Sequence, residues 1–233
     1  MNIKKHIPNT ITCCNLVSGC IATYFAFCGM LSWALLFIVI GAVFDFFDGM
    51  SARLLGVSSP IGKELDSLAD CITFGFAPSA IVFHYLSAQT SDELPCWLAT
   101  VLPFVAFVMA AFSALRLAKF NLDERQALGF IGLPTPANAL FWGSLIVGSG
   151  VWLSASPYYK YGVVVLLLVS CYLLIAEIPM FALKFKHWGW KGNEVKYVFV
   201  ISCIPILLLL RVSGLAVIIA WYIVLSVCTG RRK

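Results

Sequence analysis

The sequence predicts an all-α fold, a polytopic transmembrane helical bundle of about eight spans. Of the 233 residues, 61% are hydrophobic and 12% are charged, and a soluble domain of this size would need far more polar surface. Mean hydropathy is +0.93, and apolar runs long enough to cross a membrane recur along the whole chain. Because no polar stretch is long enough to bury a core of its own, we expect one integral membrane domain over residues 1–233.

The apolar runs set the positions of the spans. We expect them at residues 10–28, 33–54, 62–86, 97–119, 135–154, 161–183, 195–211 and 214–230. The first run follows Lys4 and Lys5, as the apolar part of a signal peptide would. It contains Asn15 and shows no convincing small-residue cleavage site, which favours a retained first span.

The basic residues predict the orientation. With the N-terminus in the cytoplasm, 14 of the 16 lysines and arginines fall on the cytoplasmic side, as the positive-inside rule requires. The 14 are Lys4, Lys5, Arg53, Lys63, Arg116, Lys119, Arg125, Lys184, Lys186, Lys191, Lys196, Arg231, Arg232 and Lys233. We therefore expect an even number of spans, with both termini cytoplasmic. The net charge of +5 then serves topology and contact with anionic membrane lipids, and it indicates no nucleic-acid partner.

Four aspartates in one short segment stand out against this apolar background. Asp45 and Asp48 are three residues apart at the end of the second span, and Asp66 and Asp70 are four apart at the start of the third. Residues at these spacings share one face of a helix. The turn between the spans is short, so we expect both pairs at the same end of the bundle.

Carboxylates that converge near hydrocarbon repel one another and are costly to desolvate, unless cations lie between them. Oxygen ligands select hard divalent ions such as Mg²⁺ or Mn²⁺. Two such ions would clamp a phosphoryl group, and the small residues Gly49, Ala52 and Gly62 would leave room for it. A single pair of aspartates would be better explained as interfacial acids paired with Arg53 and Lys63.

At these positions the chain resembles the CDP-alcohol phosphotransferase family, which shares the pattern D-x2-D-G-x2-A-R-x8-G-x3-D-x3-D. All eight fixed positions are present with the right spacing, at Asp45, Asp48, Gly49, Ala52, Arg53, Gly62, Asp66 and Asp70. The resemblance implies a membrane enzyme, usually a homodimer, that transfers a phosphate-linked group from a CDP-linked donor to a hydroxyl and releases CMP. Within the single domain we expect residues 1–183 to form the catalytic core, with 195–230 as two additional spans.

The resemblance assigns roles to these residues. The four aspartates would hold two metal ions, Mg²⁺ or Mn²⁺, and Asp70 would also be the base that deprotonates the acceptor. Gly49, Ala52, Arg53 and Gly62 would shape the donor pocket. From its own position, a polar amide near the same end of the first span, Asn15 would either join the donor pocket and face the nucleotide or brace a helix pair. A poorly nucleophilic hydroxyl needs such a base, and the arginine fork suits phosphate.

Three further stretches resemble the phosphatidylserine synthase branch of that family: "IPNTITCCNLVSG", "SALRLAKFN" and "FIGLPTPANA". This resemblance implies CDP-diacylglycerol as donor, L-serine as acceptor, and a site that faces the cytoplasm from the inner membrane. Arg116, Lys119 and Asn121 would bind the acceptor or a phosphate; Lys119 replaces the usual arginine, which keeps the charge but loses the fork.

Two alternatives are open from the sequence. A sibling enzyme would use glycerol 3-phosphate or inositol phosphate, but those acceptors should need a denser basic pocket. A cation transporter would place its acids near the bilayer midplane, whereas all four aspartates lie at the cytoplasmic ends of their spans.

Overall fold

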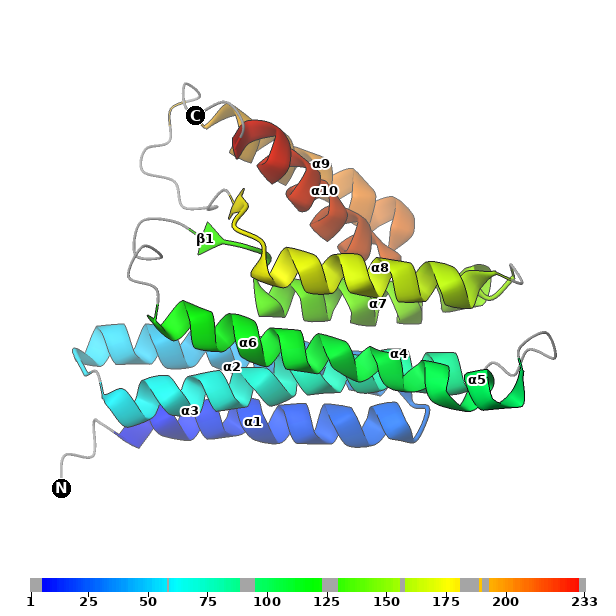
Figure 1. Ribbon diagram of the computed structural model, residues 1–233. Coiled ribbons are helices and arrows are strands. Elements are labelled where there is room, and N and C mark those ends of the chain that lie inside the picture. Colours follow the sequence, from blue (N-terminus) through cyan, green and yellow to red (C-terminus); the bar gives the residue numbers. More distant parts are fainter. Residues whose placement is uncertain are drawn as a thin grey trace.

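The computed structural model describes residues 6–57, 59–88, 95–122, 130–155, 158–180, 189 and 193–230. Within them the chain is a bundle of helices with one short pair of strands (Figure 1). The elements are α1 (His6–Phe27), α2 (Leu31–Leu55), α3 (Pro60–Asp70), η2 (Cys71–Phe76), α4 (Ala77–Ala88), α5 (Cys96–Val101), η3 (Leu102–Phe107), α6 (Val108–Leu122), β1 (Phe130–Ile131), α7 (Thr135–Leu153), α8 (Tyr159–Ile175), β2 (Pro179–Met180), α9 (Glu194–Leu210) and α10 (Ser213–Gly230).

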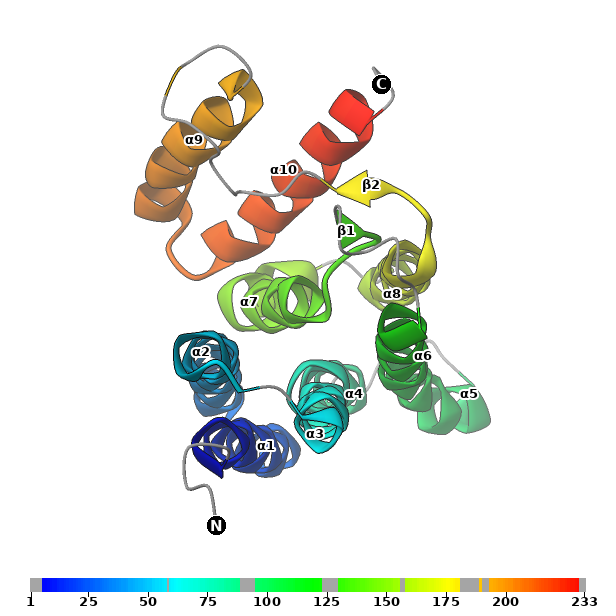
Figure 2. The same cartoon turned by 90° about the vertical axis from the view of Figure 1, so that its left-hand side faces the viewer.

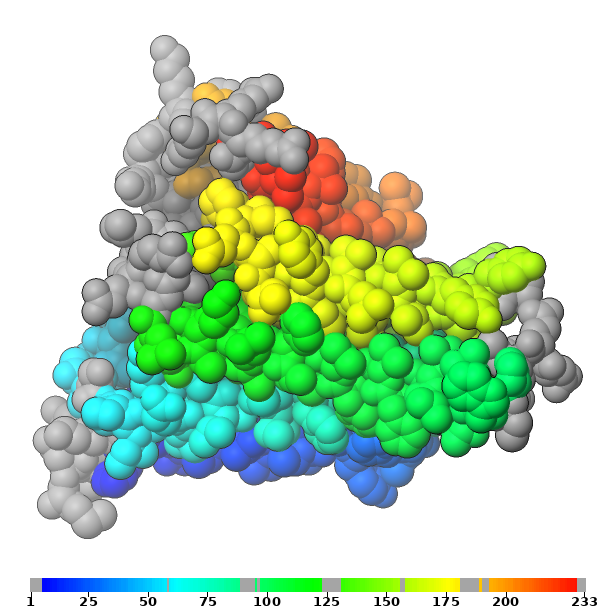
Figure 3. Space-filling model, in the orientation of Figure 1, coloured from blue at the N-terminus to red at the C-terminus, as the bar shows by residue number. Residues whose placement is uncertain are grey.

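Helix α7 lies at the centre of the bundle. Viewed along the helices, it has α2 and α4 on one side and α10 on the other (Figure 2). Its Trp142 is fully buried in the main apolar core and donates a hydrogen bond from Nε1 to Ser170 Oγ on α8, at 3.0 Å. Helices α6 and α8 lie against each other along one face of the molecule (Figure 3).

The all-α membrane fold predicted from the sequence is confirmed. Among the described residues, four continuous helical stretches are long and apolar enough to cross a membrane: His6–Phe27, Leu31–Leu55, Pro60–Ala88 and Trp97–Leu122. Helices α9 and α10 expose many large apolar side chains, as lipid-facing helices do. The total of eight spans and the side of each terminus stay predictions, and residues 1–5 and 231–233 lie outside the described residues.

The basic residues gather at one end of the bundle, as the orientation prediction requires. Helix α2 ends, α3 begins and α6 ends at the same end of the molecule (Figure 1), so Arg53, Lys63, Arg116 and Lys119 lie there. Lys160 begins α8 at the opposite end. Of the predicted cytoplasmic set, Lys4, Lys5, Arg125, Lys184, Lys186, Lys191, Arg231, Arg232 and Lys233 lie outside the described residues.

Three predicted spans contain irregularities that hydropathy did not reveal. The third span passes through a π-helical segment, η2, directly after Asp70. The fourth contains a 3₁₀ segment, η3, where Pro103 lacks the N–H of a regular turn. The sixth, expected over 161–183, ends at Ile175; Pro179 follows in β2, which pairs antiparallel with β1, and residues 181–183 are not described.

The first and third spans pack so closely that no side chain fits between their backbones at the point of contact. A Cβ atom on Gly19 of α1 would lie 2.7 Å from Thr73 Cα and 2.9 Å from Thr73 N in η2. Only glycine permits this approach, which holds α1 against the span that carries Asp66 and Asp70.

Gly19→Ala should therefore destabilise the fold by about 1–3 kcal/mol, since the added methyl meets backbone that cannot rotate away. Thermal unfolding of the purified protein in detergent would measure the change. Gly162→Ala is the matched control, because its added Cβ meets no atom within 4 Å. Equal unfolding temperatures for the two variants would contradict the close approach.

Candidate functional site

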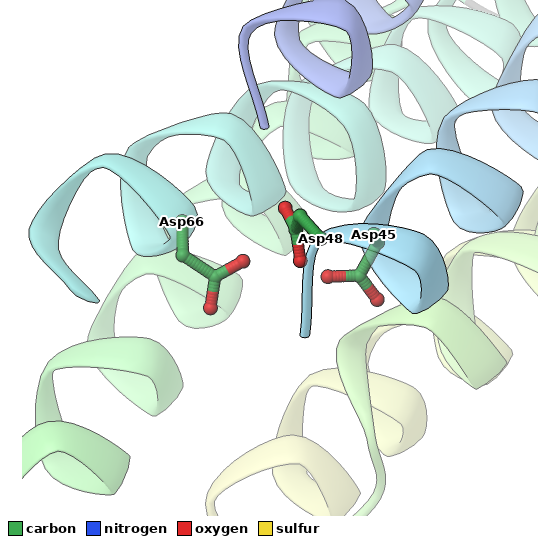
Figure 4. A group of neighbouring side chains, drawn as sticks. All are labelled: Asp45, Asp48 and Asp66. Carbon is green, nitrogen blue, oxygen red and sulfur yellow. The ribbon is translucent and has the colours of Figure 1, made fainter. Parts of the chain in front are cut away.

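Three of the four predicted aspartates form one cluster. Asp45 and Asp48 on α2 and Asp66 on α3 each offer a carboxylate oxygen, and these oxygens all lie within 4.8 Å of one another. Figure 4 shows the Asp66 carboxylate directed across the gap toward the two side chains of α2. Asp48 is only 6% exposed, so the cluster is partly withdrawn from solvent.

The turn between α2 and α3 brings these helices together. Helix α2 ends because Gly56 adopts the left-handed conformation, with φ 62° and ψ 31°. Helix α3 starts at Pro60, and the Ser59 hydroxyl caps it by accepting a hydrogen bond from the Gly62 N–H at 3.0 Å. Both signals lie in the sequence between the aspartate pairs, so the tight turn follows from local chemistry.

The cluster fits a divalent cation. Asp66 Oδ1 is buried and has no hydrogen-bond partner among the described residues, although a buried acceptor without a partner is costly. Carboxylate oxygens at this spacing repel each other and match the ligand type of Mg²⁺ or Mn²⁺. Asp45, Asp48 and Asp66 are the residues that would hold such an ion.

Asp70 lies one helical turn beyond Asp66 and outside this group of three. It is 8% exposed, and its Oδ1 accepts a hydrogen bond from Asn15 Nδ2 at 3.2 Å. It is close enough to Asp45 and Asp66 to be repelled by them, and it attracts Arg116 of α6. Asp70 is therefore a buried carboxyl group beside the cluster, within the electrostatic influence of Arg116.

A cavity of about 270 Å³ opens beside the cluster. Its lining comes from α1, the end of α2 and the start of α3, and consists of Pro8, Asn9, Thr12, Asp48, Gly49, Ala52, Val57, Ser59, Gly62, Lys63 and Asp66. Three of the predicted donor-pocket residues, Gly49, Ala52 and Gly62, are among them. Acids, a lysine and small residues around one space suit a cation together with an anionic ligand.

The structure places two other predicted donor-pocket residues elsewhere. Arg53 is exposed and is not among the described residues that line the cavity. Asn15 is fully buried and is likewise absent from that lining. Its amide contacts Asp70 instead, so Asn15 belongs to the surroundings of Asp70 rather than to the cavity wall.

The predicted acceptor residues occupy three different environments. Arg116 is buried and donates from Nη1 to Thr135 Oγ1 on α7 at 3.3 Å. Asn121 joins α6 to α3. Its side-chain Nδ2 donates to Ser67 Oγ at 2.8 Å, and its backbone carbonyl accepts a hydrogen bond from Lys63 Nζ at 2.9 Å. Lys119 is exposed. Arg116 is thus the member of the set that faces the interior near Asp70.

The sequence interpretation gave no role to Thr12. Its hydroxyl donates to Asp48 Oδ2 at 2.7 Å, and it also lines the cavity. The signal available was its position three residues before Asn15, which puts both polar side chains on one face of α1.

Fold and site together define a polytopic membrane protein with a carboxylate cluster and a polar cavity at one end of its helices, an arrangement compatible with a cation and an anionic ligand. Comparison with known proteins narrows this class. The family model for CDP-alcohol phosphatidyltransferase matches residues 5–228, and the chain belongs to that family.

Several curated relatives carry the name CDP-diacylglycerol–serine O-phosphatidyltransferase. One from Bacillus subtilis is 34% identical over 197 residues, which is 82% of this chain and 95% of the relative. One from Helicobacter pylori is 26% identical over 223 residues, covering 94% of this chain and 89% of the relative. One from Methanocaldococcus jannaschii is 34% identical over 142 residues, covering 61% of this chain and 59% of the relative.

Gly49→Ala should weaken ligand binding in the cavity without harming the fold. The added Cβ meets no atom within 4 Å, so it enters open space in the cavity wall. We expect CMP affinity, measured by calorimetry in Mn²⁺, to fall at least about fivefold, the lower end of the cost of an overpacked contact. The unfolding temperature should stay level or rise, because alanine favours helix. Unchanged CMP affinity would show that the ligand does not approach Gly49.

Proposed function

We propose that the chain is a CDP-diacylglycerol–serine O-phosphatidyltransferase, which transfers the phosphatidyl group to L-serine and releases CMP. The observation that carries the proposal is the similarity to the Bacillus subtilis relative of that name, which spans 82% of this chain and 95% of the relative. The carboxylate cluster and the cavity are compatible with the charge of a pyrophosphate donor.

In this proposal the aspartates divide the work. Asp45, Asp48 and Asp66, with Asp70 at the margin, hold two ions of Mg²⁺ or Mn²⁺. Bound divalent ions neutralise pyrophosphate charge and make CMP a better leaving group. The cavity residues Gly49, Ala52 and Gly62, with Arg53 at the end of α2, receive the CDP moiety.

The transfer itself is a displacement at phosphorus. Asp70 accepts the proton of the serine hydroxyl, and the hydroxyl oxygen bonds to the phosphorus that carries the diacylglycerol. The bond from that phosphorus to the bridging oxygen breaks, and CMP leaves with the electron pair. Arg116, with Lys119 and Asn121 nearer the helix end, binds the acceptor carboxylate or a donor phosphate.

The surroundings of the site suit a lipid substrate. Phe46 and Phe47, between the two aspartates of α2, are exposed, which offers apolar surface for acyl chains next to the acids. Because the aspartates share their end of the bundle with the basic residues, we place the site at the cytoplasmic face of the inner membrane. A homodimer, implied by the family resemblance, is part of the same proposal.

CMP release by the purified protein in detergent tests the proposal. Reactions would contain CDP-diacylglycerol with Mn²⁺ or Mg²⁺, and L-serine, glycerol 3-phosphate, inositol phosphate or no acceptor. We expect release that needs both metal and serine, with phosphatidylserine as the lipid product. Release with another alcohol and none with serine would overturn serine as acceptor, while metal-independent release would overturn the metal chemistry.

Asp70→Asn should reduce kcat by about 10²–10⁴, the usual contribution of a positioned base. Donor affinity should be retained, and Mn²⁺ affinity largely so, because Asp45, Asp48 and Asp66 remain as ligands. Single-turnover kinetics and Mn²⁺ titration would separate the two effects. Glu64→Gln is the matched control, since Glu64 is an exposed acid on the same helix. Lost Mn²⁺ binding in Asp70→Asn would make Asp70 a ligand only.

A further inference from the structure

Helix α1 carries one hydrogen-bond donor for an aspartate of the carboxylate cluster and a second donor for Asp70. The Thr12 hydroxyl donates to Asp48 Oδ2 at 2.7 Å, and the Asn15 amide donates to Asp70 Oδ1 at 3.2 Å. Both donors are withdrawn from solvent, with Thr12 3% exposed and Asn15 0% exposed. Two neighbouring side chains of one helix thus reach two aspartates on two other helices.

The position of Asn15 is fixed from several directions. Its backbone carbonyl accepts a hydrogen bond from Thr73 Oγ1 at 3.0 Å. A Cβ on Gly41 of α2 would lie 3.0 Å from Asn15 Oδ1, so the amide fits between α1 and α2 because residue 41 is glycine. One turn further along α1, Gly19 packs on the Thr73 backbone. These contacts place the Asn15 side chain at the junction of α1, α2 and η2.

We propose that Thr12 and Asn15 are positioning residues with separate tasks: Thr12 orients Asp48 as a metal ligand, and Asn15 orients Asp70 as the base. The assignment of tasks rests on the proposed function. A carboxylate with one oxygen held by a fixed donor rotates less, so its remaining lone pairs keep their direction. For Asp70 this leaves Oδ2 as the oxygen without the amide donor, available for the proton of the acceptor.

The two tasks predict opposite effects. Losing the Thr12 hydroxyl should impair metal binding, because partners behind a metal ligand typically change affinity 10–100-fold. Losing the Asn15 amide should impair turnover, because a misdirected base slows proton transfer without changing how the donor is held. If either residue had a purely structural role, its substitution would lower stability, and metal binding and turnover would change together.

The first experiment measures Mn²⁺ binding to the substrate-free protein in detergent, from the electron paramagnetic resonance signal of free Mn²⁺. Thr12→Val should weaken binding about 10–100-fold, while Thr12→Ser, which keeps the hydroxyl, should stay within about threefold of wild type. Thr23→Val is the control on the same helix, because the Thr23 hydroxyl donates to the Gly19 carbonyl within α1 itself. A folded Thr12→Val protein that binds Mn²⁺ like wild type would overturn the role of Thr12.

The second experiment separates kcat from KM in Asn15→Leu, which keeps a similar volume but removes the donor. We expect kcat to fall at least about tenfold, with Mn²⁺ affinity and the KM for CDP-diacylglycerol within about threefold of wild type. A raised KM with unchanged kcat would overturn the role and return Asn15 to donor binding. Wild-type protein that bound no Mn²⁺ would instead overturn the proposed metal site, and with it the inference for Thr12.

Discussion

The mutual repulsion of carboxylates in an apolar bundle is the constraint on which the rest of the structure depends. Asp45, Asp48 and Asp66 place oxygens within 4.8 Å of one another, and Asp70 adds a fourth carboxyl group one turn away. In a membrane protein such a group is costly unless cations and hydrogen-bond donors offset it. The short turn between α2 and α3 sets how close the carboxylates lie. The hydrogen-bond donors on α1 and the nearby Arg116 offset their repulsion.

The backbone contacts around η2 show how the apolar part of the bundle supports the charged part. Without a Cβ at Gly19 and Gly41, α1 lies close to both α2 and η2. That closeness lets the short side chains of Thr12 and Asn15 reach the aspartates. Apolar packing deeper in the bundle, around Trp142, holds α7 against the same helices. Replacing an aspartate and adding a side chain at one of these close helix contacts would therefore disturb the same site, the first through charge and the second through packing.

Much of this arrangement was predictable from the sequence, because hydropathy sets helices and residue spacing sets helix faces. Three of the four aspartates cluster, as predicted by their spacing and by the Ser59–Pro60 cap, which are local signals, while Asp70 lies outside that group of three. The contact of Thr12 with Asp48 was not predictable, because it depends on which face of α1 turns toward α2. Hydropathy also did not predict the early end of α8 or the pairing of β1 with β2, because it carries no information on backbone hydrogen bonds.

The π-helical segment has a consequence for how this membrane span can serve two purposes. Its wider turns hold more residues than α-helical turns, so the rotational phase of α4 is offset from that of α3. The face that carries Asp66 and Asp70 is therefore not extended in register into the face that packs Ala77, Ala80 and Ile81 in the core. One continuous helical span can therefore direct its polar end toward an ionic ligand and its apolar end toward neighbouring helices, with a different orientation for each.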